Sequence, residues 1–352
     1  MLIALSILTY LCILFVLLPI VKSDFWIFRS LEYSRFQNFI ICVIIVFLWI
    51  IYYALFNEID IFAFCINALC VVYLTVKIIP YSIFGIKEIK RVKKRNANRE
   101  IKILSANVLQ DNTAYNKLLQ QISVSNPDIV FLLETDEKWQ NAVKSLKENY
   151  PHSIEVPKEN TYGMLFYSKF KLIDKEINYI VKHDIPSVSC KVILHDESII
   201  QIWGLHPEPP VPGESLTSTA KDKELAIIAL KVKQCKLPTI VMGDLNDVAW
   251  SNTTSLLTKT SGLLDVRKGR GFYSTFSAHH WYIRFPLDYI FCSADFGFIS
   301  MKRLKYNGSD HFPIYTHLIY APKLKKTQKK EAPNKEVITE AKETAGQRIK
   351  VE

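Results

Sequence analysis

Polar residues lie beside three short apolar runs in this chain. The runs are residues 128–133, 239–242 and 312–315, and the polar residues next to them are Glu134, Asp244, Asn246, Asp310 and His311. A short apolar run is typical of a buried strand, and the loops at strand ends commonly carry catalytic residues. Carboxylates bind hard cations such as Mg²⁺, and amide and imidazole groups can hydrogen-bond to a phosphate. The pattern therefore indicates a site for one hard metal ion and one phosphate.

Asp244 and Asn246 alternate at the end of one predicted strand, so their side chains point the same way. A carboxylate in this position can orient or deprotonate an attacking water. An amide can donate to a phosphate oxygen where negative charge develops. The alternative is an Asx-turn without chemistry, but the preceding apolar run and the later Asp310 and His311 favour the functional interpretation.

Residues 100–321 have the pattern of one α/β domain. Strands are predicted at 101–106, 128–133, 163–167, 187–194, 199–204, 239–242, 286–292, 298–306 and 313–319, and helices at 115–123, 138–149 and 217–234. Many strands with few helices predict two packed mixed sheets with outer helices, a four-layer α/β sandwich.

Three long apolar runs precede this domain, at residues 2–21, 39–56 and 61–79. Each is about long enough to cross a bilayer as a helix. The first run could instead be a signal peptide, but no Lys or Arg precedes it and no small-residue cleavage site follows it. Residues 1–80 are therefore predicted to form three transmembrane helices, and residues 81–99 a basic juxtamembrane linker.

The basic residues of the short loops predict the orientation of these helices. The first loop carries Lys22, Arg29 and Arg35, the second loop has no Lys or Arg, and residues 87–99 are strongly basic. Basic loops stay on the cytoplasmic side. We therefore expect a multi-pass protein with its N-terminus outside and its domain in the cytoplasm, at the inner membrane if the cell is bacterial.

The net charge of +10 lies largely in residues 87–99 and 323–330. Basic clusters can bind nucleic acid or an anionic membrane, but both clusters flank the domain and are interpreted as a juxtamembrane segment and a solvated tail. Residues 322–352 are predicted to be a disordered charged tail, with a helix at 336–344 as the alternative. The seven cysteines include no C-x-x-C pair, so neither a zinc site nor a disulfide framework is predicted.

The order of the polar residues resembles that of the endonuclease/exonuclease/phosphatase superfamily. The residues that carry the resemblance are Asn107, Glu134, His206, Asp244, Asn246, Asp288, Asp310 and His311. The resemblance covers about residues 101–320 and implies a DNase I-like fold that uses magnesium to cleave phosphate esters. The His-Pro-Glu-Pro-Pro sequence at 206–210 and the basic linker resemble membrane-anchored bacterial members. Leu245 stands where the family usually has Phe, an apolar change that does not alter the chemistry.

The resemblance also implies roles for single residues. Glu134 binds Mg²⁺, or alternatively Mn²⁺, with Asn107 and Asp310 nearby, although Glu134 alone could be a surface acid and Asn107 a turn residue. Asp288 orients His311, which acts either as general base or as stabiliser of the transferring phosphoryl group. The implied substrate-binding residues are Asn246, His206 and Tyr162, of which Tyr162 could equally be a packing residue.

The expected reaction is in-line attack on phosphorus by a water that Asp244 or His311 activates. A basic groove with aromatic residues would suit a nucleic acid, and it could be formed by Lys268, Arg270, Phe272 and Tyr273, although any surface loop could offer such residues. A position beside the bilayer would suit a phospholipid. The sequence Pro-Leu-Asp-Tyr at 286–289 disfavours inositol phosphatases, which carry Trp-Cys-Asp-Arg there. The rival hypothesis is an inactive membrane scaffold or binding protein, but none of the expected catalytic residues is missing. No protein partner is predicted.

Overall fold

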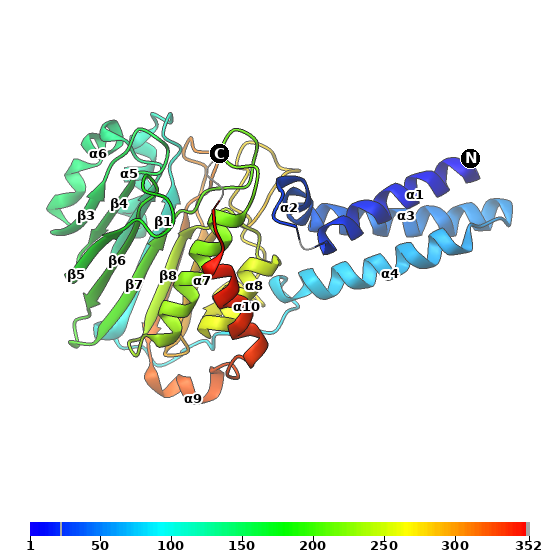
Figure 1. The fold of residues 1–352 in the computed structure, drawn as a ribbon. Helices are drawn as coiled ribbons and strands as arrows, with labels where there is room; N and C mark the ends of the chain where they lie inside the picture. Colours follow the sequence, from blue (N-terminus) through cyan, green and yellow to red (C-terminus); the bar gives the residue numbers. More distant parts are fainter. Residues whose placement is uncertain (22, 350–352) are drawn as a thin grey trace.

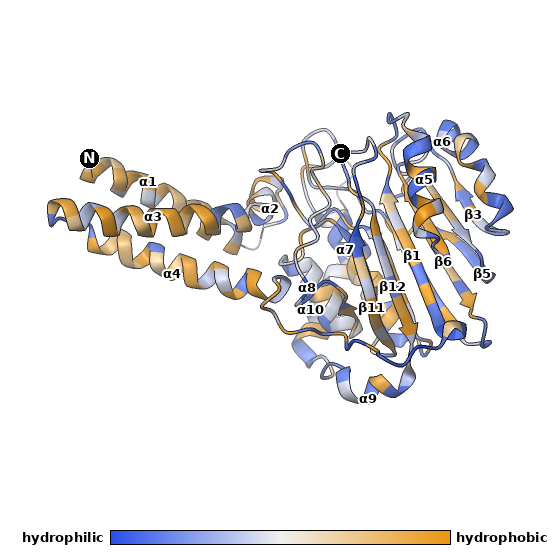
Figure 2. Ribbon diagram, turned by 180° about the vertical axis from the view of Figure 1, so that it is seen from behind, coloured by the Kyte–Doolittle hydropathy of each residue, from blue (hydrophilic) through white to orange (hydrophobic). Residues whose placement is uncertain are grey.

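A computed structural model of the chain describes residues 1–21 and 23–349. Three apolar helices form a rod that projects from the α/β domain (Figure 1). They are α1 (Leu2–Leu17), α3 (Arg35–Phe56) and α4 (Ile61–Ile78). Each is part of a helical segment long and apolar enough to cross a membrane, and Figure 2 shows the rod as largely hydrophobic. Lys22, part of the orientation argument, lies outside the described residues.

Two hydrogen bonds of polar side chains connect the helices of the rod. Trp49 Nε1 donates to Thr9 Oγ1 at 3.0 Å, and Asn67 Nδ2 donates to the carbonyl oxygen of Cys42 at 2.9 Å. Hydrogen bonds between helices help to hold apolar helices together where lipid surrounds them.

Helix α2 (Trp26–Tyr33) lies between α1 and α3 and docks onto the domain. Arg29 forms an ion pair with Asp222 at 2.8 Å. Arg35 donates to the carbonyl oxygen of Trp250 at 3.0 Å, and Trp250 Nε1 donates to that of Glu32 at 2.7 Å. The loop between the first two apolar helices is therefore part of the domain's surface.

The domain contains two six-stranded mixed sheets. The first has the order β11 (Phe296–Arg303), β12 (Ile314–Tyr320), β1 (Glu100–Asn107), β2 (Ile129–Leu133), β4 (Met164–Ser168) and β3 (His152–Val156). The second has the order β5 (Lys171–Asn178), β6 (Ser187–Ile193), β7 (Ile199–Leu205), β8 (Thr239–Asp244), β10 (Asp288–Cys292) and β9 (Leu264–Asp265). β1 with β2 and β7 with β8 are parallel pairs.

Alternating side chains along the strands divide the apolar residues between the core and the outer helices. Ile103 of β1 faces the core between the sheets, whereas Leu104 packs with Leu118 and Trp139 on the outer side. Helices α5 (Tyr115–Ser125) and α6 (Glu137–Ala142) therefore cover the first sheet. Helices α7 (Thr219–Gln234) and α8 (Asn252–Ser261) lie over the second sheet (Figure 1). The predicted four-layer sandwich is confirmed.

The segment predicted as a linker, residues 81–99, runs along the edge of the first sheet. The Val92 N–H donates to the carbonyl oxygen of Phe298 at 3.1 Å, and the Phe298 N–H donates to that of Lys90 at 2.9 Å. Ile89 is fully buried in the core between the sheets. Short 3-10 helices occur here and elsewhere, at Leu18–Ile20, Ile79–Tyr81, Ala97–Arg99, Lys144–Glu148 and Pro322–Leu324.

The expectation of disorder for residues 322–352 is wrong over two helices, α9 (Lys325–Gln328) and α10 (Lys335–Gly346). The side chain of Asn334 caps α10 by accepting from Val337 N–H at 2.9 Å. Ala341 is fully buried, and α10 lies beside α7 and α8 (Figure 1). The narrow apolar face of α10 is enough to hold this helix in place, because α7 and α8 provide a surface for it to pack against. Residues 350–352 lie outside the described part.

Candidate active site

Two aspartates meet where β8 and β10 run antiparallel. Asp244 ends β8, Asp288 begins β10, and the two are direct partners in the register of the strands. His311 comes from the loop before β12, in the other sheet. The cluster therefore lies at the seam between the sheets, and each of its three residues is at least 96% buried.

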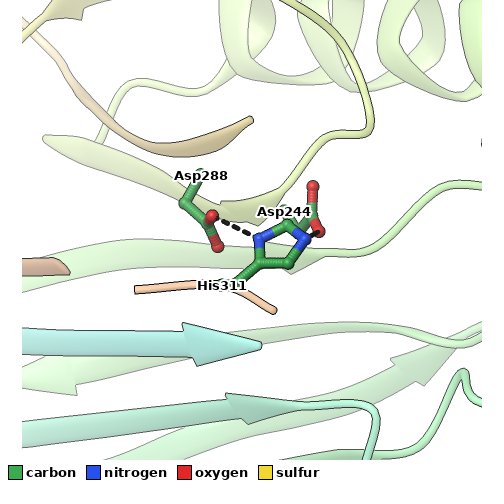
Figure 3. Close-up of side chains that lie close together, drawn as sticks. All are labelled: Asp244, Asp288 and His311. Carbon is green, nitrogen blue, oxygen red and sulfur yellow. Dashed lines mark hydrogen bonds and ion pairs between the residues drawn. The ribbon is translucent and has the colours of Figure 1, made fainter. Parts of the chain in front are cut away.

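The imidazole of His311 lies between the two carboxylates (Figure 3). Its Nδ1 lies 2.8 Å from Asp288 Oδ2, and its Nε2 lies 3.5 Å from Asp244 Oδ2. Burial lowers the pKa of His311, but the charges of Asp244 and Asp288 outweigh it and raise this pKa to about 10. Burial raises the pKa of Asp244 to about 6, against the opposing effect of His311. At neutral pH, His311 is thus a proton donor and Asp244 an acceptor.

Asn107 connects this cluster to Glu134. Its Nδ2 donates to Glu134 Oε1 at 2.5 Å and to Asp244 Oδ2 at 3.1 Å. Its Oδ1 accepts from Leu109 N–H at 3.1 Å. Asn107 was expected among the metal ligands, but the structure turns its nitrogen, not its oxygen, toward the carboxylates. In this geometry it positions Glu134 and Asp244.

Glu134 follows β2 in the left-handed region, with a φ of 57°. This conformation is strained for a residue other than glycine, and residues with such backbone strain cluster at functional sites. Burial raises the pKa of Glu134 to about 7, and the nearby carboxylates of Asp310 and Asp244 add to this. The half-buried carboxylates of Glu134 and Asp310 fit a hard divalent cation, because the cation offsets their desolvation and repulsion.

A second set of possible ligand atoms belongs to Asp244, Asp288 and His311, which lie within 4.8 Å of one another. The short contact from His311 Nδ1 to Asp288 already explains this group as a hydrogen-bonded chain. Glu134 with Asp310 is therefore the better place for a cation.

Asn246 is held on several sides. Its Nδ2 donates to the carbonyl oxygen of Pro207 at 3.0 Å, and its N–H donates to Asp244 Oδ1 at 2.9 Å. Its own carbonyl oxygen accepts from the Tyr33 hydroxyl and from Lys221 Nζ. Among the described residues, only one of the two side-chain amide hydrogens of Asn246 has a protein partner. The other is available for a ligand in the cavity that Asn246 lines.

His206 and Tyr162 lie together at another side of the cavity, with ring centroids 5.3 Å apart. Burial lowers the pKa of His206 to about 3, so its imidazole is neutral. Within the described part of the chain, its Nδ1 has no hydrogen-bond partner. The Tyr162 hydroxyl donates to Glu214 at 2.7 Å. His206 can therefore bind a ligand, whereas the hydroxyl of Tyr162 already has a partner.

These residues surround a cavity of about 430 Å³. The residues that line it are Ser30, Tyr33, Glu134, Thr161, Tyr162, His206, Pro209, Pro210, Val211, Glu214, Asp244, Asn246, Phe276, Phe285, Leu287, Asp310 and His311. The expected residues Asn107 and Asp288 lie behind it and act through their neighbours.

Sequence reasoning missed the contribution of α2 to this cavity. Ser30 and Tyr33 line it, although they belong to the loop between two apolar helices. A signal existed in Arg29, Glu32 and Arg35, which recur every three residues and give this loop one charged face.

Comparison with known proteins identifies the family and the fold. Residues 101–311 match the model of the Endonuclease/Exonuclease/phosphatase family. A search of curated proteins gives no significant match. The structure of D. rerio TDP2 with a single-strand DNA product has a TM-score of 0.54 and 19% identity, covering 62% of this chain and 98% of that chain.

Two further solved structures share the fold. The catalytic domain of human Nocturnin with bound sulfate has a TM-score of 0.52 and 17% identity, covering 63% of this chain and 95% of that chain. A mannosyl-6-phosphatase of Bacteroides thetaiotaomicron has a TM-score of 0.50 and 17% identity, covering 62% and 100%. The family match spans more than half of the chain, which therefore belongs to the endonuclease/exonuclease/phosphatase family of hydrolases acting on phosphate ester bonds.

Proposed function

We propose that the protein is a membrane-anchored, divalent-metal-dependent phosphodiesterase. The observation that carries the proposal is the continuous set of contacts from Asp288 through His311 and Asp244 to Asn107 and Glu134. It joins a protonated imidazole, an ionised carboxylate and the possible metal ligand Glu134 at one cavity. Metal-assisted hydrolysis requires these three components.

The protonation states suggest which residue does what. Asp244 accepts the proton of the attacking water, because its carboxylate is ionised at neutral pH. His311 donates from Nε2 to a phosphate oxygen, and Asp288 holds the imidazole in place through Nδ1. Asn246 and His206 bind the phosphate. Glu134 and Asp310 would hold Mg²⁺ or Mn²⁺, which neutralises charge on the phosphate when bound.

The apolar helices support a position at the membrane. By the distribution of basic residues, the domain lies on the cytoplasmic side, at the inner membrane in a bacterium. The substrate is then either a nucleic acid or a phospholipid on that side.

The test uses the full-length protein in detergent with an aryl phosphodiester, and compares Mg²⁺, Mn²⁺ and EDTA. We expect hydrolysis with metal and none with EDTA. Asp244→Asn and His311→Ala should each lower kcat by about 10³-fold or more, because each removes a group that acts at the reacting phosphate. The matched control is Asp174→Asn, an exposed aspartate on β5. Metal-independent activity, or full activity in either variant, would contradict the proposal.

A substrate panel then separates the two classes. Plasmid DNA and short RNA are compared with sphingomyelin and phosphoinositides in mixed micelles. Hydrolysis of none of these, together with an inactive wild type on the generic ester, would favour the scaffold hypothesis.

A further inference from the structure

A second cavity, of about 820 Å³, lies between the apolar helix α3 and the domain. Phe36, Gln37, Ile40 and Ile41 of α3 form one wall, and the loop around Trp281 and Tyr282 forms another. It shares no lining residue with the catalytic cavity. Gln37 Nε2 donates to the carbonyl oxygen of Tyr282 at 3.2 Å, which holds this loop against α3.

Three arginines line this second cavity, and Arg270 among them donates to carbonyl oxygens of nearby loops. The other two, Arg284 and Arg303, have no opposite charge. The guanidinium groups of Arg284 and Arg303 lie 5.2 and 4.4 Å from the centre of the same ring, that of Phe312. Their hydrogen bonds go to the carbonyl oxygens of Ser277 and Ser274. Among the described residues, no carboxylate lies within ion-pair distance of either arginine. Two guanidinium groups around one ring, without a counterion, attract an anion, and arginine binds phosphate well.

The two walls formed by α3 and by the loop around Trp281 and Tyr282 resemble a membrane interface. Trp281 is 79% exposed and Tyr282 is 56% exposed. Ile40 and Ile41, in the first turns of α3, are also exposed. Trp and Tyr are enriched at the membrane–water boundary, and α3 carries this surface directly into the apolar rod (Figure 2). The second cavity thus has cations on the domain side and an apolar path along α3.

We propose that the second cavity binds an anionic phospholipid of the surrounding membrane. The lipid phosphate pairs with Arg284 and Arg303, and the acyl chains lie along Ile40 and Ile41. A nucleic acid would bring charge but could not use the apolar wall. The site is separate from the catalytic cavity, so the inference does not depend on the proposed hydrolysis.

The test is native mass spectrometry of the full-length protein in detergent, titrated with phosphatidylglycerol or with phosphatidylcholine of the same acyl chains. We expect the anionic lipid to bind about tenfold more tightly, which corresponds to about 1.4 kcal/mol. Arg284→Gln with Arg303→Gln should remove this preference. Lys171→Gln with Lys175→Gln removes the same charge from exposed positions on β5, far from α3 (Figure 1), and should leave the preference intact.

Arg284→Lys with Arg303→Lys keeps both charges and should keep most of the preference, which separates loss of charge from loss of folding. A parallel titration uses a single-stranded oligonucleotide. The proposal is overturned if the glutamine variant keeps the wild-type preference, if the wild type has no preference, or if the oligonucleotide outcompetes the lipid at these arginines.

Discussion

The two sides of the catalytic cavity are built in different ways. The polar side consists of Asn107, Glu134, Asp244, Asp288 and His311, which come from strand ends and adjoining loops and hold one another by short hydrogen bonds. The membrane side consists of Ser30, Tyr33, Phe276, Phe285 and Leu287, which come from α2 and the segment before β10. The difference teaches that the sheets position the reacting groups, whereas segments added to the sheets shape the space for the substrate.

The largest expected effect is on the polar side, from Asp288→Asn. An amide at this position neither neutralises the imidazolium of His311 nor fixes its orientation. We expect kcat to fall by about 10³-fold or more, with a much smaller change in KM. Steady-state kinetics measures this, with Asp174→Asn as the control. A kcat within a few-fold of wild type would remove Asp288 from the mechanism.

Where α2 meets α3, behind the membrane side, Arg35→Ala should affect stability. Arg35 and Glu32 are both buried and form an ion pair at 2.9 Å. Removing Arg35 leaves the buried Glu32 carboxylate with Arg29, at 3.3 Å, as its remaining ion-pair partner, at a cost of up to about 3 kcal/mol. Thermal unfolding followed by tryptophan fluorescence tests this. Arg348→Ala, at an exposed position, should change the unfolding temperature little, and an unchanged value for Arg35→Ala would mean that α2 is not docked.

Tyr33→Phe tests whether a contact from the membrane side affects catalysis on the polar side, and it has the smallest expected effect on kcat. The hydroxyl of Tyr33 donates to the carbonyl oxygen of Asn246, next to the catalytic loop. Loss of one such bond costs about 1 kcal/mol, so kcat should fall by about fivefold. Because Lys221 still binds the same oxygen, the fold should persist. If Tyr33→Phe lowers kcat as much as Asp288→Asn, the two sides are not separable.

His206→Gln should lower the pH at which the protein unfolds in acid. The folded pKa of His206 is about 3, below its ordinary value of about 6.5. The neutral imidazole therefore contributes stability that is complete above pH about 6.5 and is lost as the pH falls toward 3. The variant has no such loss, so its acid midpoint should lie lower, by less than about one pH unit. Circular dichroism measures the midpoint, and His183→Gln, at an exposed position, is the control.

The polar side was largely predictable from the sequence, because Glu134, Asp244 and His311 each adjoin an apolar run that forms or leads into a strand. What could not be predicted depends on contacts between distant segments. The docking of α2 requires Trp250, and the burial of α10 requires α7 and α8. The direction of the Asn107 amide likewise depends on Leu109 and Glu134 together.

The position of β1 has a consequence for how the chain folds during synthesis. β1 pairs with β12, and the register joins Glu100 to Ile319. A nascent chain that has emerged as far as β10 contains Asp244 and Asp288 but lacks β11 and β12, the two strands that complete the first sheet. Pairings so far apart in sequence slow folding. His311 emerges just ahead of that last strand, so a chain that stops early has no hydrolytic centre.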